Sequence, residues 1–391
     1  MRVVFAHDHI FRKDTQGNFY TAGSFNNQVW NRYLKYFDEI IVNARLEKKK
    51  IDVNNTYNNF DLPNVYFNPV PSLSGPIKQF SKKAAASKVI RKSLSSSDAL
   101  IARLPSETGN LAIQIARELG KPYVVEVVAC VWDALWNHGS LQAKLYAPIS
   151  MLKMKKMVKK STNTVYVTNC FLQNRYPNNS YTENISNVEI EKVQFSSLTT
   201  RLTRYKNNQR LYKIGMIGSL KNKIKGLDVA LRALEILKNN KIEFEFQVLG
   251  DGDQESWKNI ARELGIEKKV KFCGVLPGGE PVLSWLDDID IYIQPSFQEG
   301  LPRAVIEAMS RGCPVVGSNA GGIPELIDED CIHASGDSRE LSKILIELMG
   351  DIKKSKYIAE RNIYEAKKYQ KDVLDEKRDR FWSNFLKEID N

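Results

Sequence analysis

Short hydrophobic runs alternate with amphipathic stretches along most of the chain. The runs are rich in β-branched and aromatic residues and stop at Pro, Ser or Gly, which is typical of buried strands. The stretches between them carry apolar residues at helical spacing, and several end at a glycine. Because strand and helix alternate, the pattern predicts an α/β fold with parallel sheets.

The predicted elements fall into two halves of the chain. In the first half we expect strands at 1–6, 40–43, 99–102, 122–128 and 164–168, helices at 25–37, 107–119 and 141–160, and a loop at 7–24. In the second half we expect strands at 212–217, 244–249, 270–273, 289–294 and 313–318, and helices at 227–237, 254–264, 302–311, 338–349 and from 355 onward. An irregular segment at 177–208 separates the halves and predicts a hinge near 199–209.

Composition narrows the class of protein. With 391 residues, 42% hydrophobic and 26% charged, the chain has the length and balance of a soluble protein with two domains. No apolar run approaches the roughly 18 residues of a membrane span, and MRVVFAHDH at the start predicts a strand rather than a signal peptide, so we expect a cytoplasmic protein. The five cysteines lack C-x-x-C spacing, so we expect mostly buried thiols.

The net charge of +11 indicates an anionic partner. The sequence has no zinc finger, helix-turn-helix or RNA-binding motif, so we set nucleic acid aside and keep phosphorylated substrates and anionic lipid. Residues 141–160 combine Leu, Ile and Met at helical spacing with many lysines. This basic amphipathic helix either lies on an anionic membrane surface or packs in the core with its lysines in solvent.

The turn after the strand at 289–294 has the features of an anion site. In an open parallel sheet, ligands bind at the carboxyl ends of the strands, where the sequence QEGLP falls. Gly300 lets the backbone approach a ligand closely. Pro302 begins a helix whose first amides, near Leu301, point at that ligand with the positive end of the helix dipole.

Two carboxylates flank this turn. Glu299 stands in the loop and Glu307 lies further along the helix, so they reach different depths of the crevice. Acceptor groups on either side of a phosphate cradle suit hydroxyl-rich parts of a ligand, such as a ribose and a hexose. A second turn, SNAGGIPE at 318–325, is expected to direct further amides to the same region.

Glu299 and Glu307, joined to GCPVVGSNAGGIPELI, resemble the signature of retaining glycosyltransferases of family 4, which have the GT-B fold. The resemblance implies two Rossmann-like, doubly wound domains that face a cleft, at 1–205 and 206–370, with a helix at 371–391 that crosses back to the first domain. It also implies a nucleotide-sugar donor, with Glu299 on the sugar hydroxyls and Glu307 on the ribose, and neither cofactor nor metal.

The family resemblance also implies further donor contacts. In GSLKNKIKG, Lys225 matches a lysine that clamps the diphosphate, whereas Ser219 replaces the usual Arg, so Lys221 or Lys223 is expected to supply the missing charge. Val275 matches the position that holds the base through its backbone. A glycine after the first strand approaches the diphosphate, for which Gly23 fits best and Gly17 is the alternative; an ordinary helix-capping turn explains either glycine equally well.

Many family members carry a His just after the strand matched by 122–128, but here that position falls at Val128 and Ala129. Asp133 and His138 are nearby substitutes, with Glu126 behind them because it lies within the predicted strand. Each of these residues has an ordinary loop or capping role as its alternative.

A D-x-D sequence at 251–253 is interpreted as a turn that begins the helix at 254–264, rather than as a metal site. The final helix carries Trp382 and Phe385 at apolar positions, which predicts packing rather than ligand contact.

The sequence therefore predicts a retaining, metal-independent hexosyltransferase that uses a UDP- or GDP-linked donor and a saccharide acceptor, lipid-linked in a surface-polysaccharide pathway. Two alternatives stay open: a nucleotide-sugar-binding subunit without turnover, and a basic scaffold on the inner face of the plasma membrane. A Rossmann dehydrogenase ranks lower, because neither half has G-x-G-x-x-G after its first strand.

Overall fold

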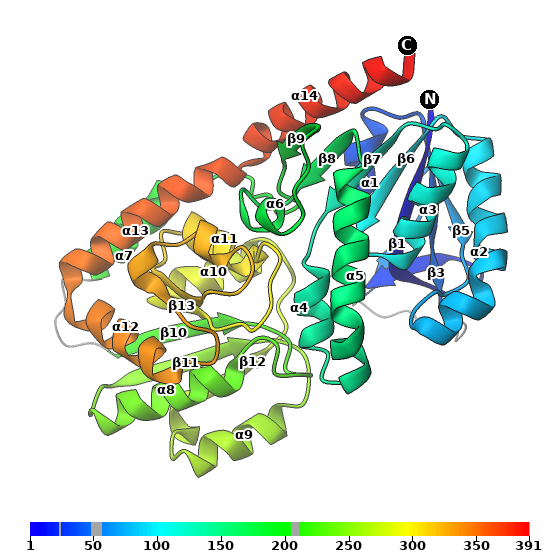
Figure 1. Cartoon of the computed structure of the whole chain (residues 1–391). Coiled ribbons are helices and arrows are strands. Elements are labelled where there is room, and N and C mark those ends of the chain that lie inside the picture. The colour runs from blue at the N-terminus through cyan, green and yellow to red at the C-terminus, as the bar shows by residue number, and fades with distance from the viewer. Residues whose placement is uncertain (23–24, 48–56, 205–210, 391) are drawn as a thin grey trace.

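Two β-sheets, one in each half of the chain, organise the fold (Figure 1). The computed structural model describes residues 1–22, 25–47, 57–204 and 211–390. The first sheet contains β1 (Arg2–Lys13), β2 (Phe19–Ala22), β3 (Glu39–Leu46), β4 (Tyr57–Asn59), β5 (Val65–Pro69), β6 (Ala99–Leu104), β7 (Tyr123–Val127), β8 (Asn163–Tyr166) and β9 (Tyr181–Asn184). Its parallel strands run in the order β5-β3-β1-β6-β7-β8-β9, and β2 and β4 extend the end of β1 in antiparallel fashion.

The second sheet is parallel throughout, in the order β12-β11-β10-β13-β14-β15. Its strands are β10 (Tyr212–Ile217), β11 (Phe244–Leu249), β12 (Val270–Gly274), β13 (Ile291–Gln294), β14 (Val315–Ser318) and β15 (Ile332–His333). The strand order reverses between β10 and β13, and ligands of doubly wound sheets bind at such a switch point.

Helices cover both sheets (Figure 1). Those in the first half are α1 (Asn27–Leu34), α2 (Pro76–Ser95), α3 (Glu107–Glu118), α4 (Val131–Trp136), α5 (Leu141–Lys159) and α6 (Phe171–Arg175). Those that follow are α7 (Phe195–Arg204), α8 (Leu227–Asn239), α9 (Gln254–Glu263), α10 (Glu280–Asp288), α11 (Arg303–Ser310), α12 (Ser338–Gly350), α13 (Ile352–Ala366) and α14 (Lys371–Asp390). Short 3₁₀ turns lie at Glu267–Lys269, Ile323–Glu325, Glu329–Cys331 and Lys367–Tyr369.

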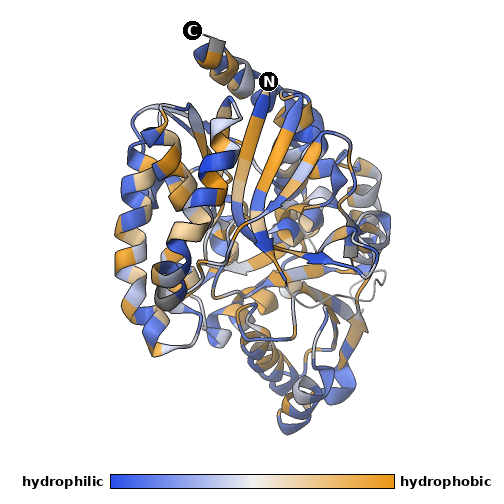
Figure 2. Ribbon diagram, turned by 90° about the vertical axis from the view of Figure 1, so that its right-hand side faces the viewer, coloured by the Kyte–Doolittle hydropathy of each residue, from blue (hydrophilic) through white to orange (hydrophobic). Residues whose placement is uncertain are grey.

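The central strands are hydrophobic along most of their length (Figure 2). Every residue of β6 and of β13 is buried. Parallel strands covered by helices on both faces carry such continuous apolar runs, whereas a half-exposed strand would alternate. The predicted fold of two doubly wound α/β domains facing each other is therefore confirmed, and we call these domains the first and second lobes.

The predicted loop at 7–24 is wrong, because β1 continues to Lys13 and forms a hairpin with β2. The Asp14 carboxylate closes the turn by accepting hydrogen bonds from the amides of Gln16, Gly17 and Asn18. Three charged or polar side chains hid this strand extension from a search for apolar runs. The following helix begins at Asn27 with Asn26 as its cap, two residues after the expected start at 25.

The chain crosses between the lobes twice, and the two crossings touch. Helix α7 already packs on the second lobe, since Arg201 donates to the carbonyls of Leu286 and Ile289. The first crossing therefore precedes Phe195, on the N-terminal side of the expected hinge at 199–209. At this crossing Ile190 pairs in parallel with Gln370, which lies just before α14.

Helix α14 returns to the first lobe (Figure 1). Trp382 lies against the rings of Tyr33, Tyr36 and Phe37, and Phe385 is fully buried. Both residues pack in the core, although Trp382 also lines the cavity between the lobes, and α14 fixes the first lobe to the end of the second.

Candidate active site

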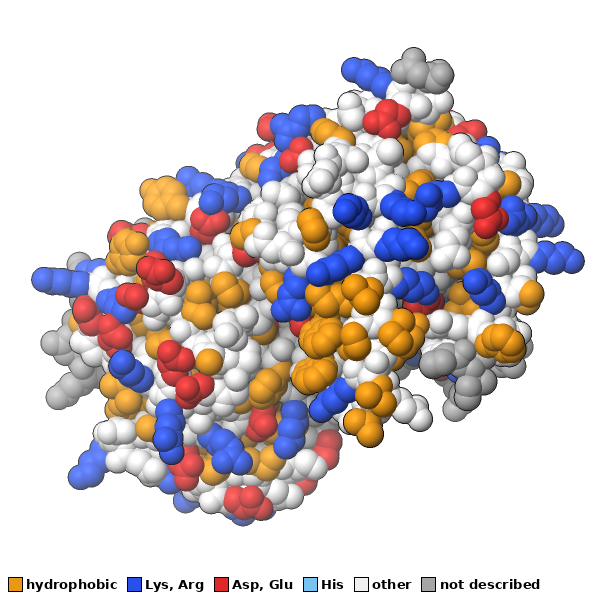
Figure 3. All heavy atoms as spheres, viewed as in Figure 1, with side chains coloured by type: hydrophobic (Ala, Val, Ile, Leu, Met, Phe, Trp, Pro, Cys, Tyr) orange, Lys and Arg blue, Asp and Glu red, His pale blue; other side chains and the backbone are white. Residues whose placement is uncertain are grey.

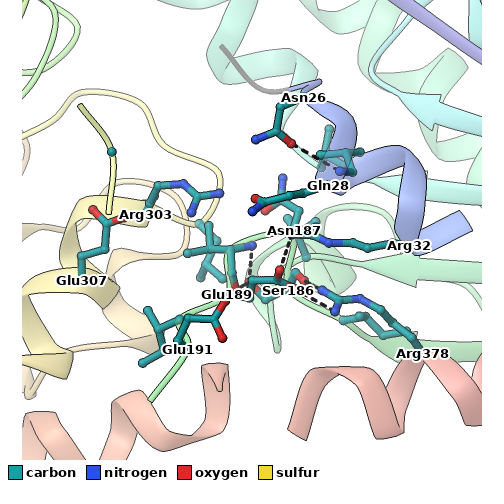
Figure 4. A pocket seen from close by; sticks show the side chains of 18 of the residues that line it. Asn26, Gln28, Arg32, Ser186, Asn187, Glu189, Glu191, Arg303, Glu307 and Arg378 are labelled. Atoms are coloured by element: carbon teal, nitrogen blue, oxygen red, sulfur yellow. Dashed lines mark hydrogen bonds and ion pairs between the residues drawn. The ribbon is translucent and has the colours of Figure 1, made fainter. Parts of the chain in front are cut away.

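A cavity of about 1170 Å³ lies between the two lobes. The first lobe contributes α1, the ends of its central strands and the crossing segment, while the second lobe contributes the start of α10 and one face of α11 (Figure 4). Its polar and charged lining includes Asn26, Gln28, Arg32, Tyr33, Arg103, Glu126, Asn187, Glu189, Arg303, Glu307 and Arg378.

One face of α11 forms the second-lobe wall. Arg303, Glu307 and Ser310 recur at helical spacing, and Leu301 lines the cavity just before them. Pro302 is the residue before the first turn of α11, so the amides of that turn have no acceptor within the helix. Burial raises the pKa of Glu307, and the Arg303 guanidinium partly offsets this rise.

Arg303 was not expected in the site. Figure 4 shows its side chain reaching from α11 toward Gln28 and Asn187 of the first lobe. Among the described residues Arg303 forms no ion pair, although it lies in a cavity rich in carboxylates. A guanidinium that meets no acidic partner is available to an anionic ligand. The sequence signal was its place in the first turn of the helix that follows the EGLP motif.

Glu299 lies behind this wall in a dense hydrogen-bond network. Its Oε1 accepts from Lys225 Nζ at 2.6 Å, Ser296 Oγ at 2.7 Å and Gln294 Nε2 at 3.1 Å. The carboxylate is buried and does not line the cavity, and neither does Lys225. Two predicted donor contacts are therefore paired with each other.

Gly300 and Gly226 allow backbones to meet. A Cβ on Gly300 would lie 2.7 Å from the carbonyl oxygen of Val128, so this turn touches the end of β7. We expected Gly300 to face a ligand, but its missing side chain makes room for the first lobe. Gly226 has φ +73°, and a Cβ there would lie 1.9 Å from the Pro295 oxygen. The loops after β10 and β13 therefore pack directly on each other.

The turn at 318–325 does not direct its amides at a ligand as expected. The amides of Asn319, Gly322 and Ile323 donate to backbone carbonyls of the second lobe. Glu325 instead accepts from the first-lobe amides of Asn169, at 2.5 Å, Cys170, at 3.0 Å, and Phe171. This turn joins the lobes.

The lysines after β10 lie away from the cavity. Lys221 pairs with Asp251 at 2.5 Å, and both side chains are about two-thirds exposed, at 65% and 68%. Ser219 and Lys223 are exposed as well, and none of these residues lines the cavity. Spacing could not reveal that Lys221 already has a carboxylate partner.

Val275 is 67% exposed and lies outside the cavity lining. The residues after β12 that do line the cavity are Gly278, Gly279, Glu280 and Leu283, just before and within α10. The predicted contact point after β12 is therefore displaced by a few residues along the chain. Gly23 lies outside the described residues, and Gly17 lies in the β1–β2 turn rather than at the cavity.

The first-lobe residues that line the cavity differ from those that the sequence favoured. Val128, at the position expected for a His, contributes an apolar side chain to the cavity. Asp133, on α4, pairs with Arg175 at 3.5 Å. His138 is exposed beside Ser140. Neither Asp133 nor His138 lines the cavity. Glu126, the least favoured of the three, is buried in β7 and does line it.

The crossing segment and α14 add charges that the sequence pattern did not single out. Arg32 and Arg378 both pair with Glu189, at 2.8 Å and 3.0 Å. Arg32 Nε is buried and has no hydrogen-bond partner among the described residues. Arg32 could have been found from the sequence, because it interrupts the otherwise apolar face formed by Val29, Trp30 and Tyr33.

No group of three His, Cys, Asp or Glu side chains suited to a metal occurs in the described part of the chain. Asp253 caps α9 by accepting from the amides of Glu255 and Ser256, as predicted for the D-x-D turn. Cys130, Cys313 and Cys331 are buried free thiols, whereas Cys170 is exposed and Cys273 is half-buried. Within 1–22, 25–47, 57–204 and 211–390, no helix is long and apolar enough to cross a membrane.

Two facing Rossmann-like lobes, a cavity between them and a last helix that returns to the first lobe define the GT-B class of glycosyltransferases. The solved structure of Anabaena Alr3699/HepE in complex with UDP has this fold: it superposes with a TM-score of 0.65 over 98% of this chain and 100% of that chain, at 17% identity.

The chain belongs to the family described as glycosyl transferases group 1, whose model matches residues 212–351. Protein CapJ of Staphylococcus aureus is 31% identical over the whole of this chain and 97% of its own length. The amylovoran biosynthesis glycosyltransferase AmsK of Erwinia amylovora is 40% identical over 134 residues, which cover 32% of this chain and 33% of AmsK.

Proposed function

We propose that this glycosyltransferase moves a hexose from a UDP- or GDP-linked donor to a saccharide acceptor, with retention of the anomeric configuration and without a metal ion. The observation that carries the proposal is the cavity between the lobes, with Glu307 and Arg303 on its second-lobe wall. HepE was solved with UDP and with UDP-glucose, which supports a nucleotide-sugar donor for this chain.

Donor binding divides between α11 and the turn before it. Glu307 accepts hydrogen bonds from the ribose hydroxyls, since an ionised carboxylate is an acceptor-only group. Glu299 and Lys225 serve the sugar and the diphosphate from the edge of the site. The ion pair between them uses one of the three protons of the Lys225 ammonium. All the hydrogen bonds that Glu299 accepts end on Oε1, which leaves Oε2 for a sugar hydroxyl.

The chemical demand is the negative charge that forms on the diphosphate when the anomeric bond breaks. Arg303 and the first-turn amides of α11 stabilise that charge, because the cation lines the cavity and the amides are held in place by the helix. Arg303 thus replaces the cation that Ser219 does not supply. The loss of one preorganised donor of this kind lowers the rate by about 100-fold to 1000-fold.

In this reaction the acceptor hydroxyl attacks from the same face as the departing diphosphate, and a phosphate oxygen takes the hydroxyl proton. The new glycosidic bond forms as the old one breaks, so the configuration is retained. The contacts between the lobes at Gly300 and Glu325 exclude water from this step.

The acceptor is a lipid-linked saccharide of a surface-polysaccharide pathway, reached from the cytoplasmic side of the membrane. AmsK, named for amylovoran biosynthesis, supports the pathway. Helix α5 supports the lipid, because Leu141, Leu145, Ile149 and Leu152 form an exposed stripe, 60% to 72% exposed, beside lysines and without an acidic residue (Figure 3).

Thermal unfolding with a panel of UDP- and GDP-sugars tests the proposal. A donor that binds the folded protein only, at about 100 times its Kd, stabilises it by about 2.7 kcal/mol. We expect one panel member to raise the Tm. Glu307→Gln is expected to lower affinity for that donor about tenfold, since a hydrogen bond to a charged acceptor is lost. Glu263→Gln, an exposed carboxylate on α9, is the control.

If no UDP- or GDP-sugar shifts the Tm, the proposed function is wrong. Donor binding without hydrolysis or transfer would favour a nucleotide-sugar-binding subunit instead. Vesicle binding with no nucleotide affinity would favour a membrane scaffold.

A further inference from the structure

Glu126 is a buried carboxylate in the first-lobe wall of the cavity. It is the fourth residue of β7, and only 8% of it is exposed. Val128, the residue after the end of β7, also lines the cavity, and its carbonyl touches the Gly300 turn. Glu126 therefore lies on the acceptor side of the cleft, next to the point where the two lobes meet.

The two carboxylate oxygens of Glu126 have different partners. Its Oε1 accepts a hydrogen bond from the Tyr33 hydroxyl at 2.8 Å. Its Oε2 forms an ion pair with Arg103 Nη1 at 3.8 Å, a distance that is beyond hydrogen-bond length. The Arg103 guanidinium also lies over the ring of Phe25, 5.2 Å from the centroid.

A hydroxyl of a bound ligand would complete the hydrogen bonding of this carboxylate. Buried polar groups are normally hydrogen-bonded, because their desolvation is expensive, and Oε2 accepts no hydrogen bond from the described residues. Tyr33 remains a donor to Glu126, since burial and the nearby carboxylate raise the pKa of its hydroxyl. Glu126 lines a polar cavity that is large enough for a sugar.

We propose that Glu126 Oε2 accepts a hydrogen bond from the attacking hydroxyl of the acceptor and aims it at the anomeric carbon. This inference rests on the proposed function and adds to it a residue that acts on the acceptor alone. Glu126 keeps no proton at the end of the reaction, because the proton passes to the departing phosphate oxygen. The carboxylate lies two residues before the position where the family resemblance predicts a His.

The test uses the full chain and the UDP- or GDP-sugar that gives the largest rise in Tm. Nucleotide release is measured with water as the attacking hydroxyl and with octyl glycosides of common hexoses as soluble acceptors. Glu126→Gln keeps the size of the side chain but replaces one oxygen with an amide that donates. We expect nucleotide release to fall about 10-fold to 100-fold while donor Kd and Tm stay within experimental error.

Tyr33→Phe is the matched variant, because it removes the neighbouring hydroxyl and leaves the Glu126 carboxylate in place. We expect it to lower nucleotide release less than Glu126→Gln does. If both variants lose Tm and nucleotide release to the same extent, Glu126 has a structural role only and the inference is wrong.

Unchanged release in Glu126→Gln would also refute the inference, as would a wild-type protein that binds donor but neither hydrolyses nor transfers it. Failure of the proposed function looks different, because the wild-type protein would then bind no nucleotide-sugar at all.

Discussion

Arg303 of α11 places a positive charge in the cavity, where a lysine of the loop after β10 was expected to supply one. If it binds the diphosphate, Arg303→Gln should weaken binding of UDP or GDP, whichever the protein prefers, about 10-fold to 100-fold. Affinity for the corresponding nucleoside, which lacks phosphates, should change less than twofold. Isothermal titration calorimetry with both ligands separates the two contributions.

Arg339 is a suitable control for this experiment. It is also exposed and also lies in the first turn of a second-lobe helix, α12, but it does not line the cavity. Arg339→Gln should leave both affinities unchanged. An equal loss of nucleoside affinity in Arg303→Gln would show that Arg303 supports the shape of the pocket rather than the phosphates.

The sequence predicted part of the site because motif residues share one helix face. Glu307 and Leu301 line the cavity, and both were chosen from the EGLP motif and its helical spacing. Lys221 and Asp133 were chosen as substitutes for family residues that this chain lacks, but they pair with Asp251 and Arg175. Such pairings join distant segments of the chain, so no local sequence pattern reveals them. The position of Glu126 in the cavity likewise depends on three elements that meet only in the folded chain.

Helix α5 has one apolar face that packs in the core and another that is exposed, so each of the two interpretations of its sequence describes one face. Met154, Met157 and Val158 are buried in the core, so the helix does pack on the first lobe. Leu145 and Ile149 point outward among lysines, on the face beside the lobe boundary (Figure 3). A periodicity search could not separate these faces, because both carry apolar residues.

If the outer stripe of α5 lies in a lipid surface, the double variant Leu145→Gln, Ile149→Gln should bind vesicles of anionic phosphatidylglycerol at least tenfold more weakly, since two large apolar side chains contribute a few kcal/mol on burial. Cosedimentation measures this binding. Leu211→Gln, at a leucine of the second lobe that is 50% exposed, is the control. Equal vesicle binding by all variants would exclude α5 as the lipid contact.

Elements with long apolar runs were predicted well. The strands β10 and β11 match the expected bounds, and α3 and α8 differ only at their ends. The missed strands, β2, β4, β5, β9 and β15, are short, and β5 and β9 have few buried residues. Their strand form depends on pairing with a neighbour that lies far away in the sequence, so their own composition gave little signal.

The two lobes act as one unit because several contacts join them across the cleft. Gly300 meets Val128, the crossings pair at Ile190 and Gln370, and Asn137 Nδ2 donates to the Phe297 carbonyl at 3.3 Å. The sequence predicted two domains and a returning last helix, but it placed the hinge at 199–209, and the described part of that range belongs to α7. Arg201 explains the difference, since its buried guanidinium ties α7 to second-lobe carbonyls.

Glu325 makes the most concentrated of these contacts, because one carboxylate accepts three consecutive first-lobe amides at the start of α6. Hydrogen bonds to a charged group contribute about 1.5–3 kcal/mol each, so Glu325→Ala should accelerate hydrogen exchange at Asn169, Cys170 and Phe171 by about tenfold or more. The amides of β13 should exchange at the wild-type rate, because the second-lobe core is untouched.

Donor hydrolysis by Glu325→Ala should rise relative to transfer, since the cleft opens to water more often. Glu360→Ala, an exposed residue of α13, should change neither quantity. Wild-type protection at the three amides in Glu325→Ala would show that other contacts hold the lobes together.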